Sequence, residues 1–155
     1  MKVRIPNEVE RVRAADVLRR EWGEPVMVRG RIYRFDDCQI LVAGEMTGIA
    51  AVSHDEWPVM ELVAINAFAQ WQGVGSALVE SIVASATAAG FEAIRLTTTN
   101  DNLDALRFYQ RRGFRLTALR PGAVDEARRL KPGISVSGKH GIPIRDELDL
   151  IRTLR

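Results

Sequence analysis

The chain has 155 residues, of which 46% are hydrophobic and 27% charged, and its formal net charge is +2. This size predicts one domain over residues 1–155, and the composition is ordinary for a soluble globular protein. No apolar run approaches the roughly 20 residues that span a bilayer, and no apolar signal segment follows the first basic residues. A single cysteine, Cys38, excludes an internal disulfide and favours the cytoplasm. We expect Cys38 to be a small strand-edge residue and not a nucleophile.

Charge is distributed unevenly along the chain. Residues 36–106 hold ten acidic residues and one basic residue, Arg95, whereas residues 1–35 hold nine basic and five acidic and residues 107–155 hold twelve and five. The basic ends suggest a nucleic-acid footprint, but aromatic residues are few and no nucleic-acid motif is present. We therefore interpret these charges mainly as solvated faces, with nucleic acid an unlikely partner.

Alternation predicts a short strand over residues 2–5, and Asn7 followed by Glu10 predicts a capped helix start. That helix ends at Gly23, and its expected apolar stripe is Val9, Val12, Leu18 and Trp22. The next stretch, residues 26–37, carries three arginines and is interpreted as an irregular segment near a substrate entrance.

Later elements are clearer. Residues 39–43 and 49–53 read as a hairpin around a glycine-bearing turn, and the apolar run 60–67 reads as a central strand buried on both faces. The remaining expectations are helices over 74–89, 102–112 and 123–130, strands over 93–99, 114–119 and 145–154, and a loop over 132–143.

The stretch Gln70-Trp71-Gln72-Gly73-Val74-Gly75-Ser76 stands between the central strand and the helix that follows it. Glycines let the backbone approach a ligand, and a helix start offers unpaired N–H groups and a positive dipole end, so this arrangement suits a phosphate. A Walker loop needs a lysine where Ser76 stands, and a dinucleotide fingerprint needs a glycine where Leu78 stands. The pattern that remains is Gln-x-x-Gly-x-Gly.

A second motif follows from Asn102 to Phe114, with Asn102, Ala105 and Tyr109 on one helical stripe. In order and spacing, the two motifs resemble the pyrophosphate loop and the Asn-x-x-Ala-x-x-Phe-Tyr-x-x-x-Gly-Phe element of the GCN5-related N-acetyltransferase (GNAT) family. The resemblance covers residues 40–120 well. It implies an α/β fold with a mixed, mostly antiparallel central sheet, splayed central strands and flanking helices. The segment 123–154 goes beyond the general pattern, and its role is open.

The resemblance also implies that acetyl-CoA is the cosubstrate. Backbone groups of Ile65 and Ala67 would pair with its pantetheine arm, and Asn102 and Tyr109 would contact it near the thioester. The pyrophosphate would be held by the amides of Gln70, Trp71, Gln72, Gly73, Val74, Gly75 and Ser76. Gln70 replaces an equally common arginine in the family, so the loop lacks one positive charge. Arg107 and Arg111 are candidates to supply it, although both also suit a solvated helix face.

Acyl transfer to an amine needs one proton removed from the amine and one delivered to the departing thiolate. Glu61 is the candidate base, because a carboxylate in an apolar strand is costly to bury without a task or a partner. Strand alternation predicts that Glu61 shares a face with Val63 and Ile65. The alternative is a residue at the exposed start of the strand, or one paired with an arginine. Asp55 and Glu56, just before Glu61, are expected to attract a cationic acceptor.

Tyr109 is the candidate acid; the alternative is a core tyrosine with a satisfied hydroxyl. No Cys or carboxylate falls at ligand spacing from His54 or His140, so no metal is expected. Trp71 is interpreted as a surface lid over the cofactor or an interface contact, and Ser76 as a helix N-cap or phosphate ligand.

The sequence thus predicts an acetyl-CoA-dependent N-acetyltransferase acting on an unidentified primary amine of a small molecule or protein, by direct attack in a ternary complex. A non-catalytic acyl-CoA-binding or regulatory module on the same fold is the alternative, which would need neither Glu61 nor Tyr109. A homodimer is compatible with either.

Overall fold

The computed structural model describes residues 2–68 and 73–154, and the chain divides into two compact units. The first comprises Met1–Val26, Tyr33–Ile94 and Leu154–Arg155, and the second comprises Met27–Ile32 and Arg95–Thr153. The expected single domain over residues 1–155 stays a prediction.

The first unit is an antiparallel sheet with strand order β1-β4-β5-β6. Its elements are β1 (Val3–Arg4), α1 (Glu8–Trp22), a 3₁₀ turn η1 (Phe35–Asp37), β4 (Gln39–Ala43), β5 (Gly48–Ser53), β6 (Val59–Ala67) and α2 (Val74–Ala88). All six residues of β5 are buried, as expected for a strand between two covered faces. The strand pair 39–43 and 49–53 and the central strand are confirmed.

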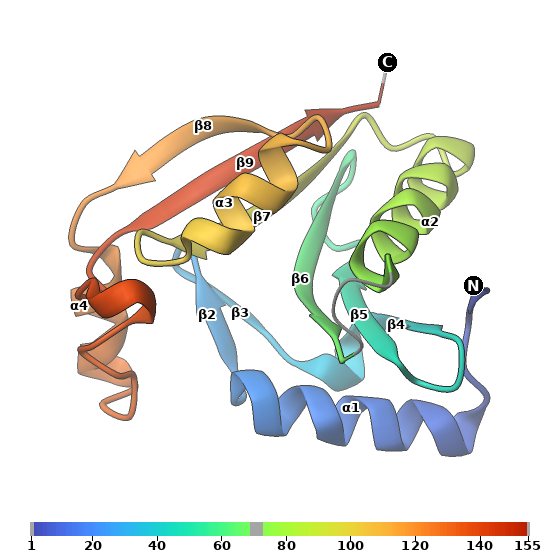
Figure 1. Ribbon diagram of the computed structural model, residues 1–155, viewed down its shortest axis with the longest axis horizontal. Helices are drawn as coiled ribbons and strands as arrows, with labels where there is room; N and C mark the ends of the chain where they lie inside the picture. The colour runs from blue at the N-terminus through green and yellow to red at the C-terminus, as the bar shows by residue number, and fades with distance from the viewer. Residues whose placement is uncertain (1, 69–72, 155) are drawn as a thin grey trace. The chain divides into compact units, whose positions relative to one another are not determined.

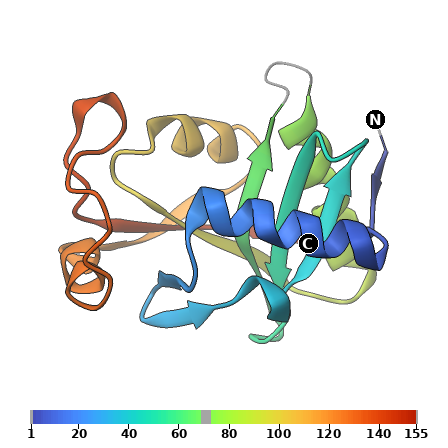
Figure 2. The same ribbon diagram turned by 90° about the horizontal axis from the view of Figure 1, so that it is seen from below.

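The two helices of this unit cover opposite faces of its sheet (Figures 1 and 2). On one face, Gly48 of β5 lies so close to α2 that an added Cβ would stand 2.3 Å from Cγ1 of Val74. On the other face, the indole N–H of Trp22, at the end of α1, donates to the side-chain oxygen of Asn66 in β6. These contacts identify an α1 face and an α2 face of the sheet.

Helix α1 begins as predicted. The Asn7 side chain accepts from the Glu10 backbone N–H at 2.9 Å, and the Glu10 carboxylate accepts from the Asn7 backbone N–H at 3.1 Å. The hydrogen bond from Arg4, followed by the one from Asn7, lowers the pKa of Glu10 to about 2. The predicted apolar stripe is wrong in composition, because Val9, Val12 and Trp22 are exposed. The side chains that face the sheet are Ala14, Ala15 and Leu18.

The expectation that residues 26–37 form an irregular segment is wrong. It forms a two-stranded sheet of β2 (Val26–Val28) and β3 (Arg31–Tyr33), followed by η1. Arg29 and Gly30 between the strands have φ of 54° and 71°. A two-residue hairpin loop with a type I′ turn requires positive φ at both of these central positions. Arginine is an unusual residue for that conformation, which is why the hairpin was not predicted.

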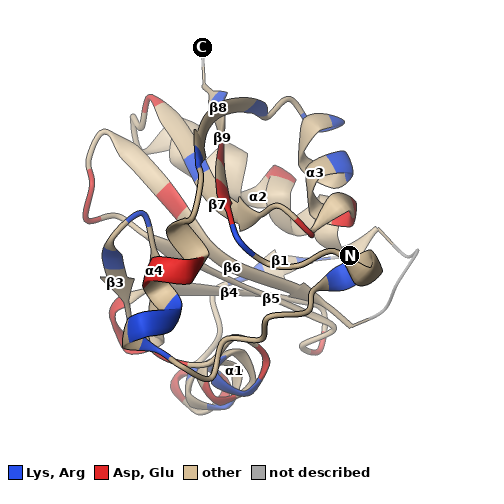
Figure 3. Cartoon of the chain, turned by 90° about the vertical axis from the view of Figure 1, so that its left-hand side faces the viewer, with Lys and Arg blue, Asp and Glu red and all other residues tan. Residues whose placement is uncertain are grey.

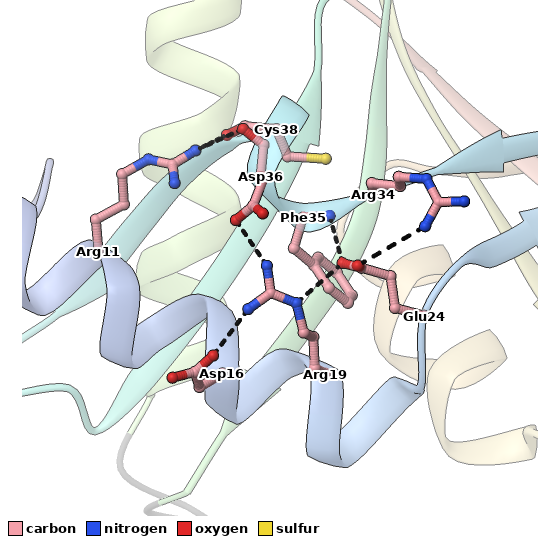
Figure 4. A network of polar contacts seen from close by, with 8 residues as sticks. All are labelled: Arg11, Asp16, Arg19, Glu24, Arg34, Phe35, Asp36 and Cys38. Atoms are coloured by element: carbon pink, nitrogen blue, oxygen red, sulfur yellow. Dashed lines mark hydrogen bonds and ion pairs between the residues drawn. The ribbon is translucent and has the colours of Figure 1, made fainter.

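An arginine network fixes the segment after this hairpin to α1 (Figure 4). Arg19 contacts carboxylates of Asp16, Glu24 and Asp36 at 2.8, 3.2 and 2.6 Å, and Arg11 donates to the Cys38 carbonyl at 2.9 Å. Cys38 is buried directly before β4, as expected for a strand-edge residue. Burial and the neighbouring Asp37 raise the pKa of its thiol to about 12, so it stays protonated at neutral pH.

The second unit has the strand order β7-β9-β8, with β8 and β9 antiparallel. Its elements are β7 (Ala93–Thr99, which begins in the first unit), α3 (Leu103–Gln110), β8 (Arg115–Arg120), α4 (Ala123–Leu130), a 3₁₀ turn η2 (Lys139–Gly141) and β9 (Glu147–Thr153). All lie where the sequence predicted a helix, strand or loop. The α/β class with mostly antiparallel strands and flanking helices is confirmed.

The contact between Gly48 and α2 predicts the cost of adding one methyl group there. Gly48→Ala would press on Val74 and Leu78, both buried in the core, and should reduce the free energy of unfolding by about 1–3 kcal/mol. Urea denaturation measures the change. Gly133→Ala is the control, because an added Cβ meets nothing within 4 Å there. An equal effect of the two substitutions would contradict close packing at Gly48.

Candidate active site

A register shift in β6 decides the orientation of Glu61. Ala51 pairs with Ala64, but the next residue of β5, Val52, pairs with Leu62, which leaves Val63 as an extra residue in the strand. This is a β-bulge, and it interrupts the alternation of side chains. Beyond it, Glu61 pairs with Ser53.

Cross-strand partners point to the same face of a sheet, so the faces can be read from the register. Ser53, Ala51 and Ile49 alternate onto one face of β5, and their partners in β6 are Glu61, Ala64 and Asn66. Asn66 bonds to Trp22 of α1. Glu61 therefore lies on the α1 face, and the predicted sharing of a face with Ile65 is wrong. The bulge is the physical reason.

The Glu61 side chain is deeply buried at 1% exposure, which excludes the alternative of an exposed strand start. Ser53 beside it is also buried, and its hydroxyl accepts from the backbone N–H of Asp55 at 3.3 Å. Asp55 is exposed, whereas Glu56 accepts a hydrogen bond from the hydroxyl of Tyr33. Of the two carboxylates expected to attract a cation, Asp55 is the more accessible.

The predicted phosphate loop leads into α2. Gly73 precedes the helix with φ of 74°, a conformation that favours glycine, and the first helical hydrogen bond runs from Ala77 N–H to Gly73 carbonyl at 2.9 Å. The amides of Val74 and Gly75 therefore occupy the first turn, where a helix has no carbonyl partner for its N–H groups. Ser76 lies inside the helix and is not its N-cap, contrary to expectation. Gln70, Trp71 and Gln72 lie outside the described residues.

The end of β6 that enters this loop is hydrogen-bonded to the β4–β5 turn and to the end of α1. Ile65 is half-buried, and Ala67 and Phe68 are exposed. Phe68 N–H donates to the Thr47 carbonyl in the β4–β5 turn at 2.8 Å. By the register, Ile65 and Ala67 lie on the α2 face, since their partners are Ala50 and Gly48.

In the second unit, Asn102 is the N-cap of α3. Its side-chain oxygen accepts from Ala105 N–H at 3.2 Å and from the Lys139 ammonium at 3.4 Å. Two turns further along the same helix, Tyr109 is buried and packs edge-on against Phe108 and Phe114. Burial raises the pKa of its phenol well above 10 despite the opposing charge of Arg112, so the hydroxyl carries its proton at neutral pH. Among the described residues, that hydroxyl forms no hydrogen bond.

The segment 131–146 is fixed against the start of α3, which the sequence analysis did not foresee. Buried Asp101 accepts from Lys139 N–H at 2.9 Å, and the Asn100 side chain accepts from the N–H groups of Arg145 and Asp146 at 2.9 and 3.0 Å. Arg128 donates to the carbonyls of residues 134, 135 and 144. The Asn100-Asp101-Asn102 run signals only a local turn, because such side chains commonly bond to nearby backbone, whereas these bonds reach residues about forty positions later.

A second missed feature is a charge cluster in β8 and β9. Arg120 contacts Glu147 at 3.1 Å and Asp149 at 2.6 Å, and Thr97 donates to Asp149 at 2.7 Å. Burial alone would raise the pKa of Asp149, but the hydrogen bonds from Arg120 and Thr97 lower it overall. Glu147 and Asp149 thus act as structural ion-pair partners.

Residues 2–68 and 73–154 contain no group of three His, Cys, Asp or Glu side chains placed to hold a metal ion. His140 contacts Asp104 at 3.3 Å, and His54 packs against Phe91.

None of the described helices is long and apolar enough to cross a membrane. Acidic and basic side chains are mixed along α1 and α4 (Figure 3).

A family model for acetyltransferases of the GNAT family matches residues 11–114, a span that includes both motifs. This chain belongs to the GNAT acetyltransferase family. It is 36% identical over 154 residues to an uncharacterized Bacillus subtilis protein, YdhI, covering 96% of each chain.

Solved structures show the same fold. A Bacillus subtilis acetyltransferase in complex with CoA aligns over 99% of this chain and 97% of its own, with a TM-score of 0.71 and 20% identity. A GNAT acetyltransferase from Elizabethkingia anophelis with acetyl-CoA bound aligns over 76% and 77%, with a TM-score of 0.67 and 20% identity. The expected GNAT fold, with its mixed and mostly antiparallel sheet, is thereby confirmed.

The first turn of α2 generates a prediction about ligand binding. Acetyl-CoA should raise the melting temperature of the wild-type protein, and Gly75→Asp should remove that shift, because a carboxylate there would repel the pyrophosphate and block close approach. Thermal denaturation with and without acetyl-CoA measures it, with Gly133→Asp as the control for an added charge. A folded Gly75→Asp variant with an unchanged shift would place the phosphates elsewhere.

Proposed function

We propose that this protein is an acetyl-CoA-dependent N-acetyltransferase that transfers the acetyl group to a primary amine by direct attack in a ternary complex. The observation that carries the proposal is the glycine-bearing start of α2 combined with the Asn102–Tyr109 helix, in a chain of the GNAT family. Two structures of similar fold hold acetyl-CoA and CoA. That similarity supports acetyl-CoA as the cosubstrate here.

Binding of the cosubstrate is assigned to backbone groups and a few side chains. The amides from Gly73 to Ser76 would hold the pyrophosphate, with Gln70, Trp71 and Gln72 completing the loop. Ile65 and Ala67 would pair with the pantetheine arm like an added strand. Asn102 would contact the same arm, and Arg107 and Arg111 are exposed and available for phosphate.

Glu61 is the proposed general base. An amine with a pKa of about 10.4 is almost wholly protonated at neutral pH and must lose a proton before it attacks. The buried position of Glu61 on the α1 face, away from α2, suits a base that meets the acceptor and not the phosphates. It would take the proton directly or through a water.

Tyr109 is the proposed general acid. Its phenol stays protonated and its hydroxyl is uncommitted among the described residues, so it has a proton to donate to the thiolate that leaves. The surrounding rings of Phe108 and Phe114 hold the phenol in one orientation.

Glu61→Gln should abolish the acidic limb of the pH profile of kcat/KM. The wild-type rate should rise with pH as the carboxylate loses its proton, whereas glutamine keeps the shape and cannot accept one. The profile is measured by release of free CoA thiol with the best amine of a panel of polyamines, aminoglycosides, amino acids and peptides. A variant profile that overlays the wild type would move the base to Asp55, Glu56 or a water chain.

Tyr109→Phe should lower turnover by roughly 10²- to 10⁴-fold and leave the acetyl-CoA affinity nearly unchanged, because only the proton donor is lost. Single-turnover thiol release measures the chemical step, and calorimetry measures the affinity. Phe108→Leu is the control for disturbed ring packing. An unchanged chemical step in Tyr109→Phe would return the residue to a purely structural role, and a wild type that never releases thiol would favour the non-catalytic module.

A further inference from the structure

The segment 131–146, between α4 and β9, lies against the turn that joins β7 to α3. That turn ends in Asn102, whose side chain is proposed to contact the pantetheine arm. The segment and the turn both belong to the second unit, so their mutual placement is internal to one compact body. The segment is thus built against a residue of the proposed cosubstrate site.

Asp101 holds the main chain of this segment in place. Its side chain is only 3% exposed, and its two carboxylate oxygens accept from the Thr99 hydroxyl and from the Lys139 N–H, the latter at 2.9 Å. Gly138 approaches the same carboxylate so closely that an added Cβ would stand 2.4 Å from Oδ2. A buried carboxylate is costly to leave without its donors, so these contacts are hard to separate. The main chain of Lys139 is therefore fixed beside Asn102.

The neighbours of the Asn102 side chain decide how its amide is turned. Oδ1 accepts from the Ala105 N–H at 3.2 Å and from the Lys139 ammonium at 3.4 Å. Both neighbours can only donate, so the amide must present its oxygen to them and cannot present its NH₂ group. Among the described residues, that NH₂ group has no hydrogen-bond partner, and the residue is half-buried. Asn102 therefore offers a ligand a donor and not an acceptor.

A second donor lies on the same side of α3. Tyr109 follows Asn102 by seven residues, two helical turns, which corresponds to roughly 10 Å of helix rise. Its hydroxyl carries its proton and has no partner among the described residues. An extended arm that contains amide carbonyls and ends in a sulfur matches this row of donors. The oxygen of such a carbonyl is the group that the Asn102 NH₂ can bind.

The ammonium of Lys139 adds a second constraint on the Asn102 amide. The bond to Ala105 alone fixes the position of Oδ1 but lets the amide turn about it, whereas two donors also fix the plane of the group. The 3.4 Å separation is long for a hydrogen bond, so its loss should weaken ligand binding only modestly.

We infer that Lys139 is a positioning residue that orients the Asn102 amide, so that its NH₂ group donates to a carbonyl oxygen of the pantetheine arm. This inference rests on the proposed function, and it gives the segment 131–146 a role in cosubstrate binding. Asp101 acts one step earlier, because it holds the main chain of Lys139.

The test measures acetyl-CoA affinity by calorimetry, which needs no acceptor. Lys139→Met removes the ammonium and keeps an unbranched side chain, and it should weaken acetyl-CoA binding by roughly three- to tenfold. Lys139→Arg should restore most of the affinity, because a guanidinium also supplies N–H donors. Lys2→Met is the matched control, since it removes an exposed lysine from the first unit, and it should leave the affinity unchanged.

Asn102→Asp tests the direction of the hydrogen bond to the ligand. Aspartate still accepts from Ala105 and Lys139, so α3 keeps its cap and the melting temperature should not fall. The second carboxylate oxygen replaces the NH₂ donor, so acetyl-CoA should bind roughly tenfold more weakly or worse. Adding Lys139→Met to this variant should weaken binding no further, because the donor that Lys139 positions is already gone.

S-acetylpantetheine, which lacks the nucleotide phosphates, separates positioning from direct contact with phosphate. Lys139→Met should weaken this ligand by the same factor as acetyl-CoA. A loss confined to acetyl-CoA would show that Lys139 meets a phosphate and would overturn the inference. Wild-type affinity in Lys139→Met, or additive effects of the two substitutions, would overturn it as well. A wild-type protein that does not bind acetyl-CoA would overturn the proposed function, and the inference with it.

Discussion

The extra residue in β6 is the constraint on which the account of the site depends. Val63 has no partner in β5, and this shift turns Glu61 onto the α1 face, while Ile65 and Ala67 remain on the α2 face. In a regular strand, Glu61 would point to the same side as Ile65, towards α2, whose first turn is the proposed phosphate site. In the proposed function the bulge would give one strand two roles: its end would offer backbone groups to the cosubstrate, and its beginning carries a carboxylate on the other face of the sheet.

The surroundings keep these two faces distinct. On the α2 side, Gly48 allows Val74 and Leu78 to approach the strands closely, which positions the first turn of α2 at the end of β6. On the α1 side, the Arg19 network and the Trp22–Asn66 bond hold helix and sheet together while Arg13 and Arg20 remain exposed. In the second unit, Arg120 forms ion pairs with two buried carboxylates, and Asp101 fixes the segment 131–146 beside Asn102.

Much of the fold followed from local sequence signals. The capping box at Asn7 and Glu10, the glycine turn before β5 and the helix over Ala123–Leu130 are local features, and the structure confirms each. The two motifs identified the family because their residues and spacing are specific. The hairpin of β2 and β3 was missed because Arg29 adopts a positive φ, which the sequence does not indicate since arginine rarely takes that conformation.

Other features depend on contacts that no local pattern contains. Valine and tryptophan residues of α1 looked like its buried stripe, but small alanines allow this helix to lie close to the sheet. The face of Glu61 was mispredicted because a bulge is a property of two paired strands.

A crystal structure of the protein with CoA tests the division of faces most directly. We predict pyrophosphate oxygens within hydrogen-bond distance of the Val74 and Gly75 amides, pantetheine paired with the backbone of Ile65 and Ala67, and the Glu61 carboxylate directed to the α1 side. CoA bound away from the start of α2, or a Glu61 side chain turned towards α2, would contradict the account.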